Sequence, residues 1–403
     1  EAPAYVEGLI AFYNEQPALA LQKAEEALRQ APWLPEPKKL MADVHYAKGF
    51  ALRHEGKYAE SRKELKAAVA LYQGAEAISR SDADIYVAEA ETWAEVIKVD
   101  VKDGSDASGD FALSQNCING LSLILRDNGE LYRLSAQIDL QFGVSLANAG
   151  KDPSRYLDKA IASGESVLSK DASHCGVLSI IGFAYLAKIM QQSGTATEPS
   201  QELEERATRV LTDAMSCNPN SNWERNQLGV AYLLVARNRT LRGVDSQREN
   251  LNALSEFQRA ISISPKDETP YPNVFQVYVD MGAVAVDAGL SAAIFSEKMD
   301  SIAKQAVANS ISSSYLKSNY AAHELNLIRE KFFNGDDFGG NFDELSILSA
   351  QALALNPSNN ETYQVLAEAH LLMAEAEVAR GAAGGARDSV VAAGAQIDEG
   401  LVA

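Results

Sequence analysis

The sequence is poor in the residues from which sheets and membrane spans are built. Trp, Phe and Tyr together make up 7% of its 403 residues, and β-branched runs are scarce. Alanine and leucine dominate the apolar residues instead, which favours helices over strands. No stretch approaches the roughly 18 consecutive apolar residues of a membrane-spanning helix, and the first residues resemble no secretory leader. A chain this long exceeds the size of a single compact core, so we expect several domains or a repeat.

Cysteine is also scarce. Cys117, Cys175 and Cys217 are an odd number and lie far apart in the sequence. We expect small apolar side chains at helix interfaces of a reduced, cytoplasmic protein. A disulfide or a metal site is the alternative that the sequence leaves open.

Motifs for catalysis and metal binding are missing as well. No histidine pairs with another His or Cys at helical spacing, and no Gly-x-Ser-x-Gly motif is present. Glu89 and Glu91 are two residues apart and diverge on a helix, so we expect them on a solvated face. The triplet from Asp337 to Gly339 spells a kinase motif, but no glycine-rich loop or His-Arg-Asp loop accompanies it. The sequence therefore predicts no enzyme, no cofactor and no metal in this chain.

Positive charge is in deficit, since the net charge is −19. Such a surface repels phosphate backbones and anionic headgroups, so we expect neither a nucleic-acid nor a membrane partner. From residue 334 to the end, eleven acidic residues stand against two arginines, which leaves −9. A solvated acidic face explains this excess, and a dock for a basic partner is the sharper alternative.

What the sequence does contain is a repeat. Small residues recur every 46 positions at Ala214, Ala260, Ala306 and Ala352. The position five residues later is held by Pro219, Pro265, Ile311 and Pro357. Proline ends a helix because it lacks the N–H and clashes with the preceding turn. The spacing therefore predicts units of two helices with a closely packed crossing.

The residues between these positions carry a family resemblance. Leu228, Gly229 and Tyr232 are followed by Ala253, Phe257 and Ala260, and similar series occur in other units. This pattern resembles the tetratricopeptide (TPR) repeat. The resemblance implies an all-α, right-handed superhelical solenoid of about nine antiparallel helix pairs. We expect one solenoid over 1–403, with repeats at roughly 1–34, 35–80, 82–128, 130–172, 174–220, 222–267, 268–313, 314–358 and 360–403. The later repeats are about 46 residues long, so we expect longer helices there.

A narrower resemblance covers residues 30–170. The segment from Ala31 to Asp82, and the run from Gly150 to Arg155, look like the long-repeat TPR regions that follow bacterial serine/threonine protein kinases. That resemblance implies a regulatory arm that recruits substrates or regulators for a kinase.

The most informative polar residues fall on the expected first helices of the pairs. The lysines and arginine with which co-chaperone TPR proteins hold a C-terminal carboxylate are absent at these positions. An amide series occurs instead, with three members spaced by 46 residues. The candidate groove residues are Gln141, Gln227, Asn273, Asn319, Asn226, Gln276 and Gln364. Exposed amides can donate to and accept from the backbone of an extended peptide.

The sequence thus predicts a protein- or peptide-binding scaffold. The alternative is a sensor that holds a small molecule or a signalling peptide. A cluster of buried aromatic residues on the concave face would favour the sensor, and Tyr271, Tyr278 and Tyr315 are its candidates.

Overall fold

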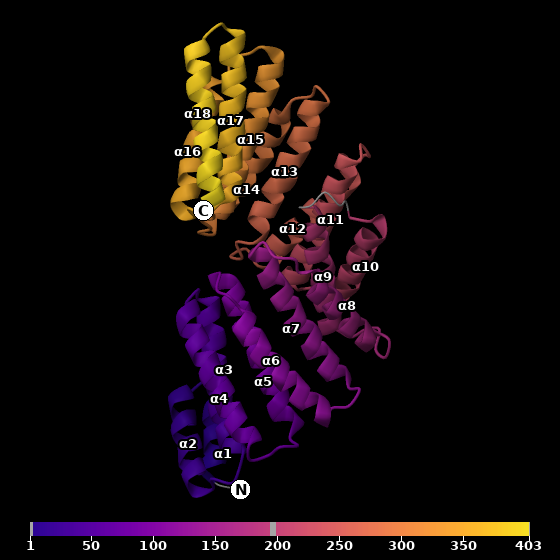
Figure 1. Ribbon diagram of the computed structural model, residues 1–403, viewed down its shortest axis with the longest axis vertical. Coiled ribbons are helices and arrows are strands. Elements are labelled where there is room, and N and C mark those ends of the chain that lie inside the picture. The colour runs from indigo at the N-terminus through magenta and orange to yellow at the C-terminus, as the bar shows by residue number, and fades with distance from the viewer. Residues whose placement is uncertain (1–2, 194–198, 403) are drawn as a thin grey trace. The chain divides into compact units, whose positions relative to one another are not determined.

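The computed structural model of the protein describes residues 3–193 and 199–402, and the regular elements there are all helical (Figure 1). The chain divides into two compact units, residues 1–217 and 218–403. We call them unit 1 and unit 2 and describe each by itself. The single uninterrupted solenoid expected from the sequence stays a prediction.

Unit 1 contains ten helices in its described part. They are α1 (Pro3–Tyr13), α2 (Pro17–Gln30), α3 (Glu36–His54), α4 (Tyr58–Glu76), α5 (Ala83–Asp103), α6 (Ser108–Ile124), α7 (Gly129–Asn148), α8 (Ser154–Leu168), α9 (Cys175–Ser193) and α10 (Gln201–Cys217).

Unit 2 contains eight α-helices and one 3-10 turn in its described part. They are α11 (Asn222–Leu241), α12 (Gln247–Ile263), α13 (Pro270–Asp287), η1 (Ala292–Phe295), α14 (Ser296–Ala308), α15 (Ser314–Asn334), α16 (Gly339–Leu355), α17 (Asn360–Ala379) and α18 (Ala383–Val402).

Consecutive helices pack as antiparallel pairs, so the described helices form nine pairs. Helix α7 begins at Gly129, one residue before its expected repeat range, and the division into repeats stays a prediction. Within each unit the first helices of neighbouring pairs also contact one another, as α5 contacts α7 and α13 contacts α15. Second helices of neighbouring pairs make no comparable contact in the described residues. The all-α solenoid of TPR-like helix pairs is therefore confirmed, while its handedness stays a prediction.

The helix crossings are as close as the repeat predicts. A Cβ atom on Gly182 would lie 2.5 Å from Leu211, and one on Gly229 would lie 2.5 Å from Phe257. Any larger residue there would force the Leu211 or Phe257 side chain to move, because real Cβ contacts are longer. The alanines at the 46-residue spacing are buried too, with Ala260 at 0% exposure. Helices α10, α12 and α16 each end two residues before a proline.

Two features of unit 1 differ from simple expectation. Helix α9 is long and apolar enough to cross a membrane by length and composition alone. It packs against α7, α8 and α10, however, which is how a core helix of a helical repeat is placed. Helices lengthen from the second pair onward, since α3 already has 19 residues against 11 in α1.

The expectation of three reduced cysteines is wrong. Cys175 and Cys217 form a disulfide with a Cα–Cα distance of 5.6 Å, whereas Cys117 is free and buried as expected. The bond joins the first residue of α9 to the last residue of α10. An antiparallel pair brings these two ends together, although 42 residues separate them in sequence.

Candidate functional site

The amide series lies where the sequence places it, on the first helices of the pairs. Gln141 is on α7 of unit 1; in unit 2, Asn226 and Gln227 are on α11, Asn273 and Gln276 on α13, Asn319 on α15 and Gln364 on α17. Their surroundings differ from expectation. Asn226, Gln227 and Asn319 are 3%, 7% and 6% exposed, so the expected exposure of these side chains is wrong.

Several of these amides bind the neighbouring first helix. The Asn273 Nδ2 donates to Asn226 Oδ1 at 2.9 Å, and the Asn319 Nδ2 donates to the Pro272 carbonyl at 2.8 Å. A further amide that sequence reasoning missed, Asn326, donates to the Val279 carbonyl at 2.9 Å. Each bond spans 47 residues, one repeat plus one position. These amides therefore tie α11 to α13 and α13 to α15, which leaves them fewer groups for a peptide.

The remaining members of the series are more accessible. The Gln276 Nε2 donates to Asp280 Oδ1 at 2.8 Å, and Asp280 also pairs with Arg237 at 2.6 Å. Gln364 is exposed and Gln141 is half-buried. Their role in holding a peptide stays a prediction.

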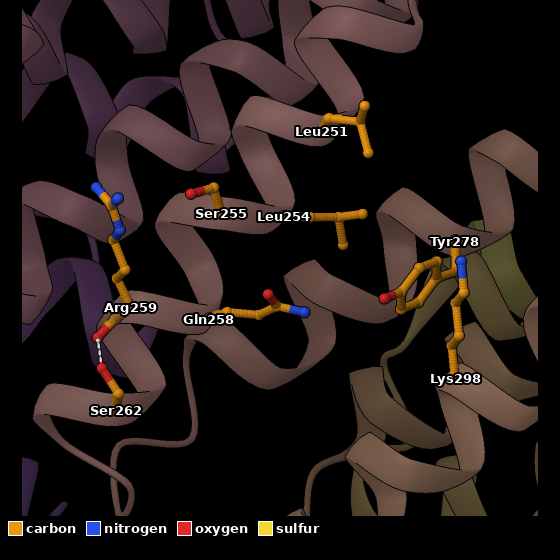
Figure 2. Close-up of a pocket in the computed structure, with 8 residues that line it drawn as sticks. All are labelled: Leu251, Leu254, Ser255, Gln258, Arg259, Ser262, Tyr278 and Lys298. Carbon is orange, nitrogen blue, oxygen red and sulfur yellow. Dashed lines mark hydrogen bonds between the residues drawn. The ribbon is translucent and has the colours of Figure 1, made fainter.

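An open groove lies elsewhere in unit 2, between α12 and α14 over α13 (Figure 2). It has a volume of about 480 Å³. The lining residues are Leu251, Leu254, Ser255, Gln258, Arg259 and Ser262 from α12, Tyr278 from α13 and Lys298 from α14. The α12 residues recur at spacings of three, four, seven and eight, which puts them on one face of that helix.

The groove opens where the repeat departs from its pattern. Ile311 replaces the proline of the other units, and the second helix of this pair is short: α14 has 13 residues against 17 in α12. The missing length is taken up by η1, which ends at Phe295. The Phe295 ring stacks on Tyr278 with 5.9 Å between centroids.

The groove is cationic. Lys298 Nζ lies 5.9 Å from the Tyr278 ring centroid and 5.7 Å from that of Phe295. Such contacts attract an ammonium group to the ring faces without using its three N–H donors. Within the described part of the chain, Lys298 has no ion-pair partner. At the other end Arg259 pairs with Glu256 at 3.3 Å, so its charge is partly compensated.

Tyr278 faces the groove from its floor. The side chain is 6% exposed, and in Figure 2 its hydroxyl points between Leu254 and Gln258. Within the described residues this hydroxyl has no hydrogen-bond partner. Burial raises the pKa of Tyr278 above its usual value, so the phenol is a neutral donor at physiological pH. The hydroxyl opens to the groove, where a ligand or water can accept its hydrogen bond.

The other two aromatic candidates, Tyr271 and Tyr315, do not line the groove. The Tyr271 hydroxyl donates to the Pro265 carbonyl at 2.8 Å and accepts from Asn309 at 3.2 Å. Tyr315 is 50% exposed on α15. Tyr278 is thus the one of the three that lines the groove.

Unit 1 contains buried carboxyl groups that the sequence did not reveal. Glu89, expected on a solvated face, is 2% exposed and accepts from Gln73 and Trp93, each at 2.9 Å. Burial, followed by the hydrogen bond and charge of Glu89, raises the pKa of Glu76 to about 9. The Glu76 carboxyl group therefore carries its proton at neutral pH.

Two further acids of unit 1 are perturbed. Burial raises the pKa of Asp139 to about 6, against the weaker opposing charges of Lys159 and Arg155. The pKa of Asp100 is raised to about 6 by burial and by Asp110, against the opposing ion pair with Arg62. In the described part of the chain, no group of three or more His, Cys, Asp or Glu side chains is arranged to hold a metal.

No protein-family model matches the sequence, and no curated protein does either. Some solved structures are similar to the chain, with low TM-scores and low sequence identity. A TPR protein from Parabacteroides merdae is 12% identical with a TM-score of 0.40, over 81% of this chain and 98% of that one. YrrB, described as a TPR protein with an unusual peptide-binding site, is 14% identical with a TM-score of 0.33, over 61% and 95%.

Human IFIT1, solved as a dimer with PPP-AAAA, is 12% identical with a TM-score of 0.40, over 96% of this chain and 88% of that one. Similarities at such scores carry no argument about function.

Proposed function

We propose that the chain is a protein-binding scaffold and that unit 2 holds a segment of a partner protein in the groove between α12 and α14. The observation that carries this proposal is the open groove itself, which is lined by two leucines and by the Tyr278 hydroxyl, a donor without a partner in the described residues. A partner group that accepts from this hydroxyl gains a hydrogen bond there.

The dimensions of the groove suit an extended segment. The lining of α12 runs from Leu251 to Ser262, which is about 16 Å at 1.5 Å per residue. An extended chain covers that length with about five residues at 3.3 Å each. Polar side chains on α12 supply donors and acceptors along the way, and the two leucines supply an apolar wall.

Partner capture with a blocked groove tests the proposal. Gln258 is exposed, so Gln258→Trp fills the groove without disturbing the core. Gln351→Trp is the matched control, because Gln351 is exposed on α16, another second helix, and does not line the groove. We expect the wild type and Gln351→Trp to retain the same partner and Gln258→Trp to lose it. Equal capture by all three proteins, checked for helicity by circular dichroism, would contradict the proposal.

A finer proposal is that the scaffold serves a serine/threonine kinase. Its support is the resemblance of residues 30–170 to kinase-associated TPR regions. The coding sequence that surrounds this chain provides the test: an upstream kinase domain is expected, and a parent protein without one removes the idea. If the kinase domain is present, the groove would recruit substrates or regulators for it.

Two expectations about surroundings also remain proposals. The net charge of −9 from residue 334 onward supports a contact with a basic partner segment in addition to the groove. For the location, the Cys175–Cys217 disulfide counts against the cytoplasm, where thiols are kept reduced. Thiol labelling of the protein from its native cells, before and after reduction, tells whether Cys175 and Cys217 are reduced, as in the cytoplasm, or oxidised, as in an oxidising compartment.

A further inference from the structure

We infer that the groove selects an acidic segment of the partner: one carboxylate held by Lys298 and a backbone carbonyl held by the Tyr278 hydroxyl, beside an aliphatic side chain that packs on Leu251 and Leu254. The inference rests on the proposed function, because it names the chemistry of the partner that this same groove takes. It assigns the anionic contact to a surface between second helices.

Charge carries the first step. The protein as a whole has a net charge of −19, yet both charged residues that line the groove are cations. Arg259 is shared with Glu256, which also pairs with Arg225 at 2.8 Å. Lys298 has no ion-pair partner in the described residues, and its contacts are the two aromatic rings. A partner carboxylate therefore gains an ion pair at the α14 end, whereas a lysine or arginine there would be repelled.

Hydrogen bonding carries the second step. Lys298 Nζ lies 5.9 Å from the centroid of the Tyr278 ring, and Figure 2 draws the hydroxyl at the other end of that side chain. A segment with a carboxylate offers its charge to the ammonium group and a backbone carbonyl to the hydroxyl. Charge-assisted hydrogen bonds of this kind are about twice as strong as neutral ones. A neutral amide could satisfy the hydroxyl but would leave the ammonium charge without its counter-charge.

Apolar surface carries the third step. Leu251 is 52% exposed and Leu254 is 7% exposed, and both stand on the wall that Tyr278 faces. Beyond them the amide of Gln258 offers a donor and an acceptor to a peptide backbone. A free inorganic anion would use Lys298 and leave this wall uncovered. A segment with a carboxylate next to an aliphatic residue uses all of it.

The experiment is a selection from a phage-displayed library of random 12-residue peptides on the immobilised protein, with recovery compared on wild type, Gln258→Trp and Gln351→Trp. Peptides that bind wild type and Gln351→Trp but not Gln258→Trp are groove-dependent. We expect these to be enriched in Asp or Glu next to Leu, Ile or Val. Groove-dependent peptides without acidic enrichment would overturn this inference and leave the proposed function standing. An absence of groove-dependent peptides would overturn both.

Titration of one selected peptide then measures the contacts. Replacing its Glu by Gln, or its Asp by Asn, is expected to weaken binding about tenfold, and the loss should shrink as salt rises. Lys298→Met should weaken the acidic peptide by a similar factor and leave the amide peptide unchanged. Equal affinity of the two peptides for the wild type would overturn the inference.

The hydroxyl has its own test. Tyr278→Phe keeps the ring stack on Phe295 and removes the donor, so we expect about two- to tenfold weaker binding. Tyr363→Phe is the control, because the Tyr363 hydroxyl donates to the Pro357 carbonyl away from the groove. Octanoate serves as a free aliphatic carboxylate. Binding of octanoate as tight as that of the peptide would replace the partner segment by a small ligand and overturn the inference.

Discussion

Units 1 and 2 share the helix-pair fold but stabilise their first helices differently. In unit 1 the links between neighbouring first helices are ionic, as in Arg53–Glu95 at 2.9 Å and Arg133–Glu91 at 2.7 Å. Unit 2 has ion pairs too, and adds the neutral amide bonds of Asn273 and Asn319. An amide keeps its donors and acceptors at every pH, whereas a buried carboxyl group does not.

The difference teaches where each unit is vulnerable. Unit 1 contains a disulfide and the carboxyl groups of Glu76, Asp100 and Asp139, whose pKa values are raised. Unit 2 contains Glu324, whose pKa is raised mainly by burial. We therefore expect redox state to act on unit 1 alone and pH to act on it more strongly. Hydrogen exchange resolved by peptide separates the two units in each test below.

The largest effect is expected from the disulfide. Cys175→Ser opens a loop of 42 residues, which costs about 4 kcal/mol in the chain-entropy model of disulfide stabilisation. Exchange should rise most in α9 and α10 and remain unchanged in α15 to α18 of unit 2, since repeat contacts are between neighbours. The wild type in dithiothreitol should match the variant. A wild type that dithiothreitol leaves unchanged would show that the bond adds no stability.

A smaller effect, of opposite sign, is expected at Asp139. Its pKa is about 6 in the folded chain, against 3.8 ordinarily, so the folded state binds more protons between these values. Stability therefore falls as pH rises from about 4 to 6 and is flat above that range. Asp139→Asn removes this loss and should stabilise unit 1 by about 1 to 3 kcal/mol at pH 8, with little effect at pH 4.

Asp280→Asn in unit 2 is the contrasting variant for that measurement. Asp280 pairs with Arg237 and accepts from Gln276, so its removal should destabilise at pH 8. Chemical denaturation at pH 4 and pH 8 gives the sign of each change in stability, and hydrogen exchange shows which unit it affects. Destabilisation by both variants at pH 8 would contradict the contrast between the units.

The smallest effect concerns the amide pair of unit 2. Asn226→Ala and Asn273→Ala each remove one partner of a bond of 2.9 Å. A double-mutant cycle should give a coupling energy of about 1 kcal/mol, the usual net value of a hydrogen bond. The cycle of Asn226 with the exposed Gln364 should give none. Additive losses in the first cycle would mean that this bond contributes nothing to stability.

The sequence was sufficient for the helix pairs because their signals are local. Small residues at Ala260 and Ala352, and prolines five positions later, follow from the geometry of a single pair. Side-chain burial depends on the next pair as well. Glu89 and Asn226 look solvated on their own helices, but both are buried. Glu89 contacts Gln73 on α4, the second helix of the preceding pair, and Asn226 contacts Asn273 on α13, the next first helix.

The groove and the disulfide were harder for the same reason. The sequence signal for the groove was Ile311 in place of proline, which marks an irregular unit without saying that α14 is short. For the disulfide, the separation of 42 residues matches one helix pair, so the ends of α9 and α10 meet. A separation of about one helix pair could have indicated this disulfide. The odd number of cysteines favoured free thiols instead.

The disulfide also has a mechanical consequence. Under tension a helical repeat protein can unravel pair by pair, and 42 residues pulled straight would add about 140 to 150 Å of length. The bond between Cys175 and Cys217 withholds that length, since it joins the two ends of the α9–α10 pair covalently. Force is carried across the pair through the sulfur atoms instead of through its helices. This pair would keep its helices between two ends held 5.6 Å apart while its neighbours extend.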